Sequence, residues 1–135
     1  MITIMIADDH AILRHGLEQL LTTTEDMTVT ASAADGREIV EKVAADPPDI
    51  VLMDLSMPVM DGVEATRAIL EAHPEVAVVV LTSFSDQRRV LDALDAGAVG
   101  YLLKDSDPDT LLSALRSTAA GGAPLDPKAA RVLLS

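Results

Sequence analysis

Short aliphatic runs alternate with stretches of helical spacing along almost the whole chain. The runs are rich in Val and Ile, and they occupy residues 2–7, 28–32, 49–53, 76–81 and 99–103. After each run, apolar residues recur at i, i+3 and i+4, which is the spacing of an amphipathic helix. Strands that alternate with single helices form βαβ units, which require a parallel sheet and right-handed crossovers. The alternation therefore predicts an α/β domain with five strands and five helices.

The character of the runs and of the residues between them supports this prediction. The run at 77–81, AVVVL, is apolar throughout, as in a strand that is buried on both faces of a sheet. Helices must then cover both faces, which gives a doubly wound fold of three layers. Asp107-Pro108 is typical of a helix start, Pro47-Pro48 of a helix that has ended, and Gly97 of a C-terminal cap.

Composition narrows the classes of function. The chain has 135 residues, enough for one domain, and contains no cysteine, which excludes disulfides and thiolate metal sites. Its net charge of −12 opposes binding to a phosphate backbone, so this segment is not expected to bind nucleic acid by itself. The N-terminus lacks the features of a signal peptide, and no apolar stretch has the length of a membrane span. We therefore expect a soluble protein with no membrane partner.

Polar residues follow four of the predicted strands. They are Asp8 and Asp9, Asp54, Thr82, and Lys104. Ligands of doubly wound sheets bind outside the carboxyl ends of the strands, so these side chains are expected to converge at one edge. Two carboxylates about 4 Å apart repel each other by roughly 4 kcal/mol at an effective dielectric constant of 20. Mg²⁺, which prefers oxygen ligands, would relieve this repulsion, and an aspartate beside it can act as a nucleophile on phosphorus.

Each of these residues also has an ordinary structural interpretation. Asp9 alone would be read as a helix cap, Asp8 as a solvated strand end, and Lys104 as a surface lysine. Thr82 could be an ordinary threonine at the end of a strand. Asp54 is harder to explain in this way, because a carboxylate directly after the apolar run IVLM is costly to bury without a partner.

Four segments in order carry a resemblance to a known family. They are IADDH at 6–10, DIVLMDLSMPVMDG at 49–62, VVVLTS at 78–83 and GAVGYLLKD at 97–105. With them the chain resembles the receiver domain of bacterial two-component response regulators, over residues 1–121. The segment 119–135, AAGGAPLDPKAARVLLS, resembles the start of the linker in the NarL/FixJ subclass, which carries a LuxR-type helix-turn-helix domain.

The resemblance implies a flavodoxin-like fold with strand order 2-1-3-4-5 and a phosphoryl acceptor at Asp54. It also implies that Asp8 and Asp9 hold Mg²⁺, together with Asp54 and the backbone carbonyl of Ser56. The reaction expected is transfer of a phosphoryl group to Asp54 from a sensor histidine kinase. The domain is expected to be a switch module rather than an enzyme, and to act in the cytoplasm.

Three further roles follow from the resemblance. Lys104 corresponds to the lysine that pairs with the phosphoryl group, Thr82 to the switch hydroxyl, and Tyr101 to the switch aromatic that turns inward on activation. The chain departs from many receivers at Asp105, which follows the lysine where they have a cis-proline. No cis peptide bond is therefore expected there.

The expected output is a change in self-association and in an attached domain. The face made by the fourth helix, fifth strand and fifth helix carries Arg88 and Arg89 beside acidic residues, so it is expected to form a homodimer on phosphorylation. The competing surface is the first and fifth helices, and the alternative is a monomer throughout. Residues 122–135 are expected to be a linker, or an extra helix, that leads to an effector domain outside this sequence. DNA would be bound only through that domain. A stand-alone receiver or phosphorelay module is the alternative.

Two other classes of function share this architecture. A phosphatase with an aspartate nucleophile would need a second acid two residues after it, and Ser56 occupies that position. A flavin- or nucleotide-binding protein of the same architecture would need a glycine-rich phosphate loop, and no GxGxxG or GxxxxGK[ST] segment is present. Both classes are disfavoured.

Overall fold

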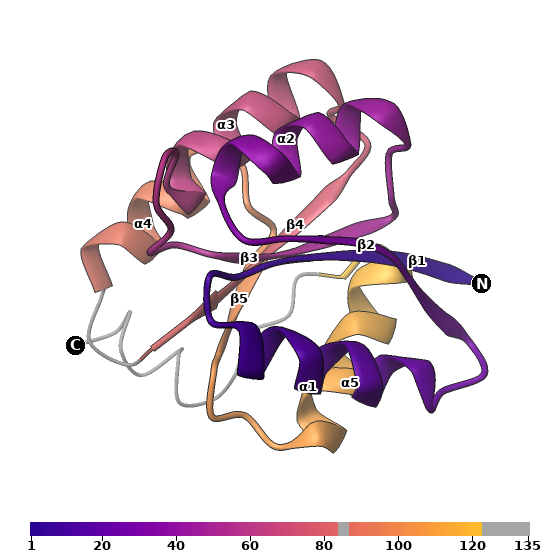
Figure 1. Cartoon of the computed structure of the whole chain (residues 1–135). Helices are drawn as coiled ribbons and strands as arrows, with labels where there is room; N and C mark the ends of the chain where they lie inside the picture. Colours follow the sequence, from indigo (N-terminus) through magenta and orange to yellow (C-terminus); the bar gives the residue numbers. More distant parts are fainter. Residues whose placement is uncertain (84–86, 123–135) are drawn as a thin grey trace.

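A five-stranded parallel sheet forms the centre of the protein in a computed structural model that describes residues 1–83 and 87–122 (Figure 1). The strands are β1 (Ile2–Ala7), β2 (Met27–Ala33), β3 (Ile50–Asp54), β4 (Ala77–Thr82) and β5 (Gly100–Leu103). Their order in the sheet is β2-β1-β3-β4-β5, and every neighbouring pair is parallel. The predicted flavodoxin-like topology is confirmed.

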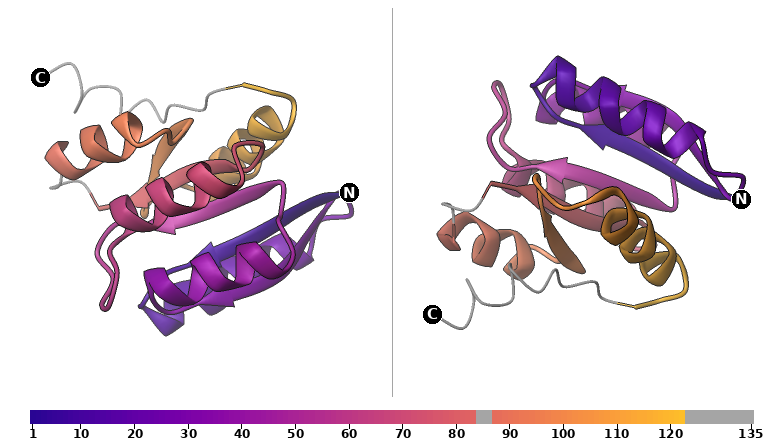
Figure 2. Two further views of the ribbon diagram at one scale, coloured as in Figure 1. Left: turned by 90° about the horizontal axis from the view of Figure 1, so that it is seen from above. Right: turned by 90° about the horizontal axis from the view of Figure 1, so that it is seen from below.

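Helices cover both faces of this sheet. They are α1 (Ala11–Thr22), α2 (Gly36–Ala45), α3 (Gly62–Ala72), α4 (Gln87–Asp95) and α5 (Pro108–Ala119). Helices α1 and α5 lie on one face, and α2, α3 and α4 lie on the other (Figures 1 and 2). Each face has its own apolar core: Leu17 and Leu115 belong to one, Ile39 and Ile69 to the other. None of the helices in the described ranges has the length and apolar character that a membrane span requires.

Two helix ends have the capping interactions that the sequence predicts. Asp107 accepts a hydrogen bond from the backbone N–H of Thr110, with Pro108 as the first helical residue. Gly97 has φ +113°, and the N–H groups of Gly97 and Ala98 donate to Leu94 and Ala93, which is the Schellman pattern. The reading of Asp9 as the cap of the first helix is wrong, because His10 occupies that position and makes no side-chain cap bond.

The third strand ends at Asp54, one residue beyond the apolar run at 49–53, and this matters for the site. Asp54 is still part of β3, where it lies opposite Leu81 of β4. All five residues of β3 are buried, because the strand lies in the middle of the sheet between β1 and β4. The carboxylate is therefore fixed by the sheet itself and not by a loop. As expected for Asp105, the described residues contain no cis peptide bond.

Residues 55–61 connect this strand to α3 in a loop that is held at both ends. The N–H of Gly62 donates to the carbonyl of Leu55, and the N–H of Gly36 at the start of α2 donates to the carbonyl of Met60. Between them Val59 adopts φ +70°, which is unusual for a β-branched residue. A Cβ added at Gly36 would lie 2.1 Å from the Met60 oxygen, so only glycine permits this approach.

Replacing Gly36 by alanine is expected to lower the free energy of unfolding by about 1–3 kcal/mol, since the Met60 peptide must move away. Gly16 on α1 is the matched control, because a Cβ there meets no atom within 4 Å. Gly16→Ala should raise the free energy by about 0.5–1 kcal/mol through helix propensity. Urea unfolding of both variants measures the difference. Equal effects would contradict the close packing of the 55–61 loop on α2.

Candidate functional site

Two buried carboxylates lie at the carboxyl edge of the sheet. Asp8 directly follows β1 and is 0% exposed, and Asp54 ends β3 and is 2% exposed. Asp9, the next residue after Asp8, is exposed. The three carboxylates and the ring of His10 offer ligand atoms that all lie within 4.8 Å of one another. The convergence predicted from the strand ends is therefore present in the structure.

Lys104 is the cation that faces the buried pair. Its Nζ lies 3.1 Å from Oδ1 of Asp54 and 3.4 Å from Oδ2 of Asp8. The residue follows β5, and its backbone N–H donates to the carbonyl of Thr82, which fixes the ends of β4 and β5 together. One lysine offsets one of the three carboxylates, so the cluster keeps an excess of negative charge.

The charge of the two buried carboxylates is incompletely compensated. Oδ2 of Asp8 and Oδ2 of Asp54 are both buried and accept no hydrogen bond from the described residues, although Lys104 Nζ lies 3.4 Å from the Asp8 oxygen as an ion pair. Burial, followed by repulsion from Asp8, raises the pKa of Asp54, although Lys104 and the N–H of Ser56 act in the opposite direction. Unsatisfied buried oxygens of this kind suit a hard cation with oxygen ligands. The acidic cluster could therefore hold a metal ion.

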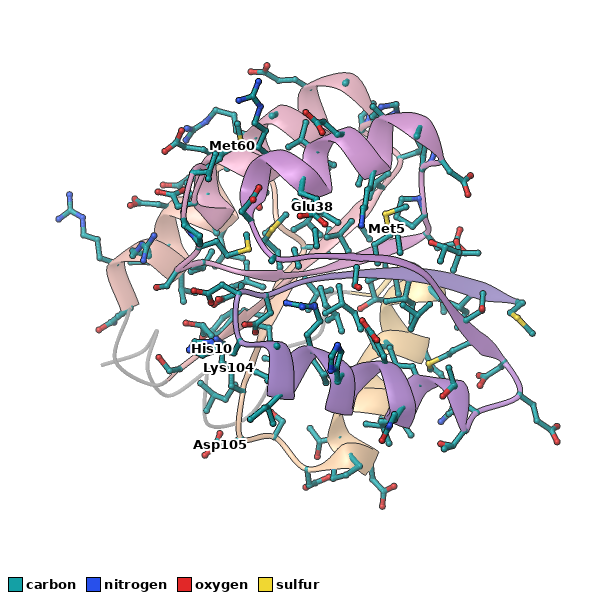
Figure 3. All side chains as sticks on the ribbon, in the orientation of Figure 1. Met5, His10, Glu38, Met60, Lys104 and Asp105 are labelled. Atoms are coloured by element: carbon teal, nitrogen blue, oxygen red, sulfur yellow. The ribbon has the colours of Figure 1, made fainter. Side chains whose placement is uncertain are left out.

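His10 is a member of this cluster that the sequence reasoning missed. Its backbone N–H donates to Oδ1 of Asp8 at 2.8 Å, and its ring Nδ1 lies 3.1 Å from Asp8 and 3.2 Å from Asp9. Figure 3 shows His10 and Lys104 at the same edge of the sheet, and both line one pocket. The only signal in the sequence is that His10 directly follows the acidic pair.

This pocket has a volume of about 640 Å³ and opens above the carboxyl ends of the strands. Its lining includes Asp54, Ser56, Thr82 and Lys104, so four of the predicted site residues face one space. The Thr82 hydroxyl is not bonded to Asp54; it donates to the carbonyl of Ser83 at 3.1 Å. A small anionic group could enter this pocket and reach the Asp54 carboxylate and Lys104 together.

The structure places Tyr101 away from the pocket and Arg89 against the loop that follows Asp54. Tyr101, on β5, is buried in the core cluster that also contains Val90 of α4, and it does not line the pocket. Arg88 is exposed on α4. Arg89, expected beside it on an outer face, instead donates to Oγ of Ser56 and to the carbonyl of Leu55, each at 2.8 Å.

Comparisons with known proteins identify the family. The family model of the response regulator receiver domain matches residues 4–116. The chain belongs to the response regulator receiver family. The transcriptional regulatory protein LnrK of Bacillus subtilis (strain 168) is 44% identical to this receiver over 135 residues, all of this chain and 61% of LnrK. The oxygen regulatory protein NreC of Staphylococcus carnosus is 41% identical over 126 residues, 93% of this chain and 58% of NreC.

Solved structures agree with this assignment. A LuxR-family response regulator from Aurantimonas sp. SI85-9A1 superposes with a TM-score of 0.92 and 35% identity, over 99% of this receiver and 96% of that chain. Similarity to LuxR-family regulators confirms the subclass that the segment at 119–135 suggested. The receiver spans 51–61% of the length of these curated relatives.

Replacing Asp54 by Asn should stabilise the metal-free receiver. Because the folded-state pKa of Asp54 is raised, the ionised carboxylate destabilises the fold at pH values above that pKa, and this cost disappears below the ordinary aspartate pKa. At pH 7 with a chelator present, Asp54→Asn should therefore raise the free energy of unfolding by about 1–3 kcal/mol. The gain should shrink as the pH falls toward about 4.

Exposed Asp92 on α4 supplies the control, since Asp92→Asn should change the free energy by less than about 0.5 kcal/mol at either pH. Urea denaturation at the two pH values measures both variants. An Asp54→Asn variant that is less stable than the wild type at pH 7 would show that the carboxylate is compensated in the folded protein.

Proposed function

We propose that Asp54 accepts a phosphoryl group from a sensor histidine kinase and that the receiver thereby changes conformation. The observation that carries this proposal is the placement of a buried carboxylate at the base of an open pocket, 3.1 Å from a lysine and beside an acidic cluster. Burying a carboxylate whose negative charge is only partly compensated destabilises the fold, which a purely structural role would not require. A buried carboxylate that a substrate can approach through an open pocket can react.

The metal for this reaction is proposed to be Mg²⁺. Asp8, Asp9 and Asp54 would hold it, with the carbonyl of Ser56, and the unsatisfied oxygens of Asp8 and Asp54 fit such an ion. When bound, it would neutralise negative charge on the phosphoryl oxygens. His10, whose ring nitrogen lies against Asp8 and Asp9, stands at the border of the same cluster.

Asp54 and Lys104 would carry out the remaining steps of the transfer. A carboxylate oxygen of Asp54 forms a bond to phosphorus, and the bond from phosphorus to the donor's imidazole nitrogen breaks with its electron pair remaining on the nitrogen, which takes up a proton. Lys104 already lies on the Asp54 side of the pocket and would pair with the transferred group. The domain thus takes part in its own modification without being an enzyme for a separate substrate.

Thr82 and Tyr101 are proposed to form the switch. In the structure the Thr82 hydroxyl is bonded to Ser83, so it would have to turn to reach a phosphoryl oxygen on Asp54. Hydrogen bonds to a charged group contribute about 1.5–3 kcal/mol each. Two of them approach the roughly 5.5 kcal/mol that takes a two-state equilibrium from 1:99 to 99:1. Tyr101 is buried in this structure, and its proposed role is to hold the inward position when Asp54 is modified.

The output is proposed to be control of transcription in the cytoplasm. Residues 1–121 would be the receiver and 122–135 the linker to a DNA-binding domain; residues 123–135 lie outside those the structure describes. Relatives named as transcriptional regulators are longer than this chain. A structure of two RcsB dimers bound to two parallel DNAs superposes with a TM-score of 0.89 and 26% identity, over 98% of this chain and 68% of that one. This similarity supports a homodimer, and we propose that phosphorylation promotes it. A stand-alone receiver or phosphorelay module is the second candidate.

Phosphorylation is tested by incubating the receiver with acetyl phosphate and Mg²⁺ and measuring the intact mass. The wild type should gain one phosphoryl group, and the gain should vanish with a chelator or in Asp54→Asn. The exposed-site variant Asp92→Asn should be modified like the wild type, because Asp92 lies on the outside of α4. A full phosphoryl gain in Asp54→Asn would overturn the assignment of the acceptor.

A further inference from the structure

Arg89 joins helix α4 to the loop that follows Asp54. Its guanidinium donates to Oγ of Ser56 and to the carbonyl of Leu55, each at 2.8 Å, and lies 3.6 Å from Oδ2 of Asp61. Leu55 and Ser56 begin the loop, and Asp61 ends it as the N-cap of α3. One side chain thus contacts both ends of the 55–61 loop from a different helix.

The atoms that Arg89 contacts are connected directly to the candidate site. The Leu55 carbonyl also accepts a hydrogen bond from the N–H of Gly62, so Arg89 completes the bonding of that oxygen. The backbone N–H of Ser56 points to Oδ1 of Asp54 at 3.4 Å. A shift of this peptide segment would therefore change the surroundings of the acceptor carboxylate and of the Ser56 carbonyl proposed to bind Mg²⁺.

We propose that Arg89 is a positioning residue, which holds the 55–61 loop in the conformation that binds Mg²⁺ at Asp54. This inference rests on the proposed function, because it assumes that the Ser56 carbonyl is a metal ligand. The role requires the forked geometry of arginine: separate nitrogens reach Ser56 and Leu55, whereas a lysine presents a single charged nitrogen. The positive charge alone would repel a cation, so the benefit must come from geometry.

A charge-conserving pair of variants separates geometry from charge. Arg89→Lys keeps the charge and loses the two-point contact, and Arg88→Lys makes the same change at the exposed neighbouring position. Mg²⁺ is titrated into each protein, and the affinity is read from backbone amide shifts in NMR spectra. Arg89→Lys should weaken Mg²⁺ binding by roughly tenfold, as is usual for partners that orient metal ligands. Arg88→Lys should match the wild type.

A second readout needs no metal. If Arg89 fixes the Leu55 carbonyl, the amide of Gly62 that bonds to it should exchange with solvent several-fold faster in metal-free Arg89→Lys than in Arg88→Lys. In addition, Ser56→Ala should weaken Mg²⁺ binding in the wild-type background and have little further effect in Arg89→Lys, because both changes remove the same contact.

Failure of the positioning role of Arg89 can be distinguished from failure of the proposed function. If the wild type neither binds Mg²⁺ nor takes up a phosphoryl group, the function itself is wrong. If the wild type does both and Arg89→Lys has the same Mg²⁺ affinity and the same Gly62 exchange rate as Arg88→Lys, the positioning role of Arg89 is overturned. Thermal unfolding of both variants within a few degrees of the wild type verifies that each is folded.

Discussion

The burial of two carboxylates at one edge of the sheet is the constraint on which the rest of the site depends. Asp54 is fixed by strand pairing in β3, and Asp8 follows the neighbouring strand β1, so neither can move away from the other without breaking the sheet. Lys104 compensates part of this charge, and two carboxylate oxygens remain without a hydrogen bond. The fold thus leaves negative charge at this edge that is only partly compensated. Under the proposed function, a cation and a phosphoryl group would interact with this charge together.

The elements around this edge connect the carboxylates to the surrounding helices. The 55–61 loop is fastened to α2 through Gly36 and to α4 through Arg89, while Lys104 and Thr82 join the ends of β5 and β4. Helix α4 is therefore connected through Arg89 to the loop that follows Asp54, and it comes after β4, which ends at Thr82, in the chain. Under the proposed function, modification of Asp54 would alter the loop and the end of β4, and through them the position of α4. This suits a domain whose output is a change of its surface and not a chemical product.

Much of this architecture could be predicted from the sequence, because its signals are local. Aliphatic runs that alternate with helical spacing determine the sheet, and the carboxyl ends of parallel strands must meet, which brings Asp8, Asp54 and Lys104 together. The contacts of His10 and Arg89 could not be predicted in this way. The spacing of apolar residues predicts exposed positions for both residues. Their partners depend on how a loop turns and on which side of α4 faces that loop. The rotation of the Thr82 hydroxyl is likewise a tertiary property.

The carboxylate cluster is proposed to be a cation site, because Lys104 compensates only part of its negative charge. The most direct measurement is calorimetric unfolding with increasing Mg²⁺ at constant ionic strength, for the wild type and for Asp8→Asn. Mg²⁺ at 100 times its dissociation constant should stabilise the wild type by about 2.7 kcal/mol. Asp8→Asn removes a buried charge from the cluster, so it should be the more stable protein without Mg²⁺ and gain little from its addition. Equal stabilisation of both proteins by Mg²⁺, or none of the wild type, would contradict the account.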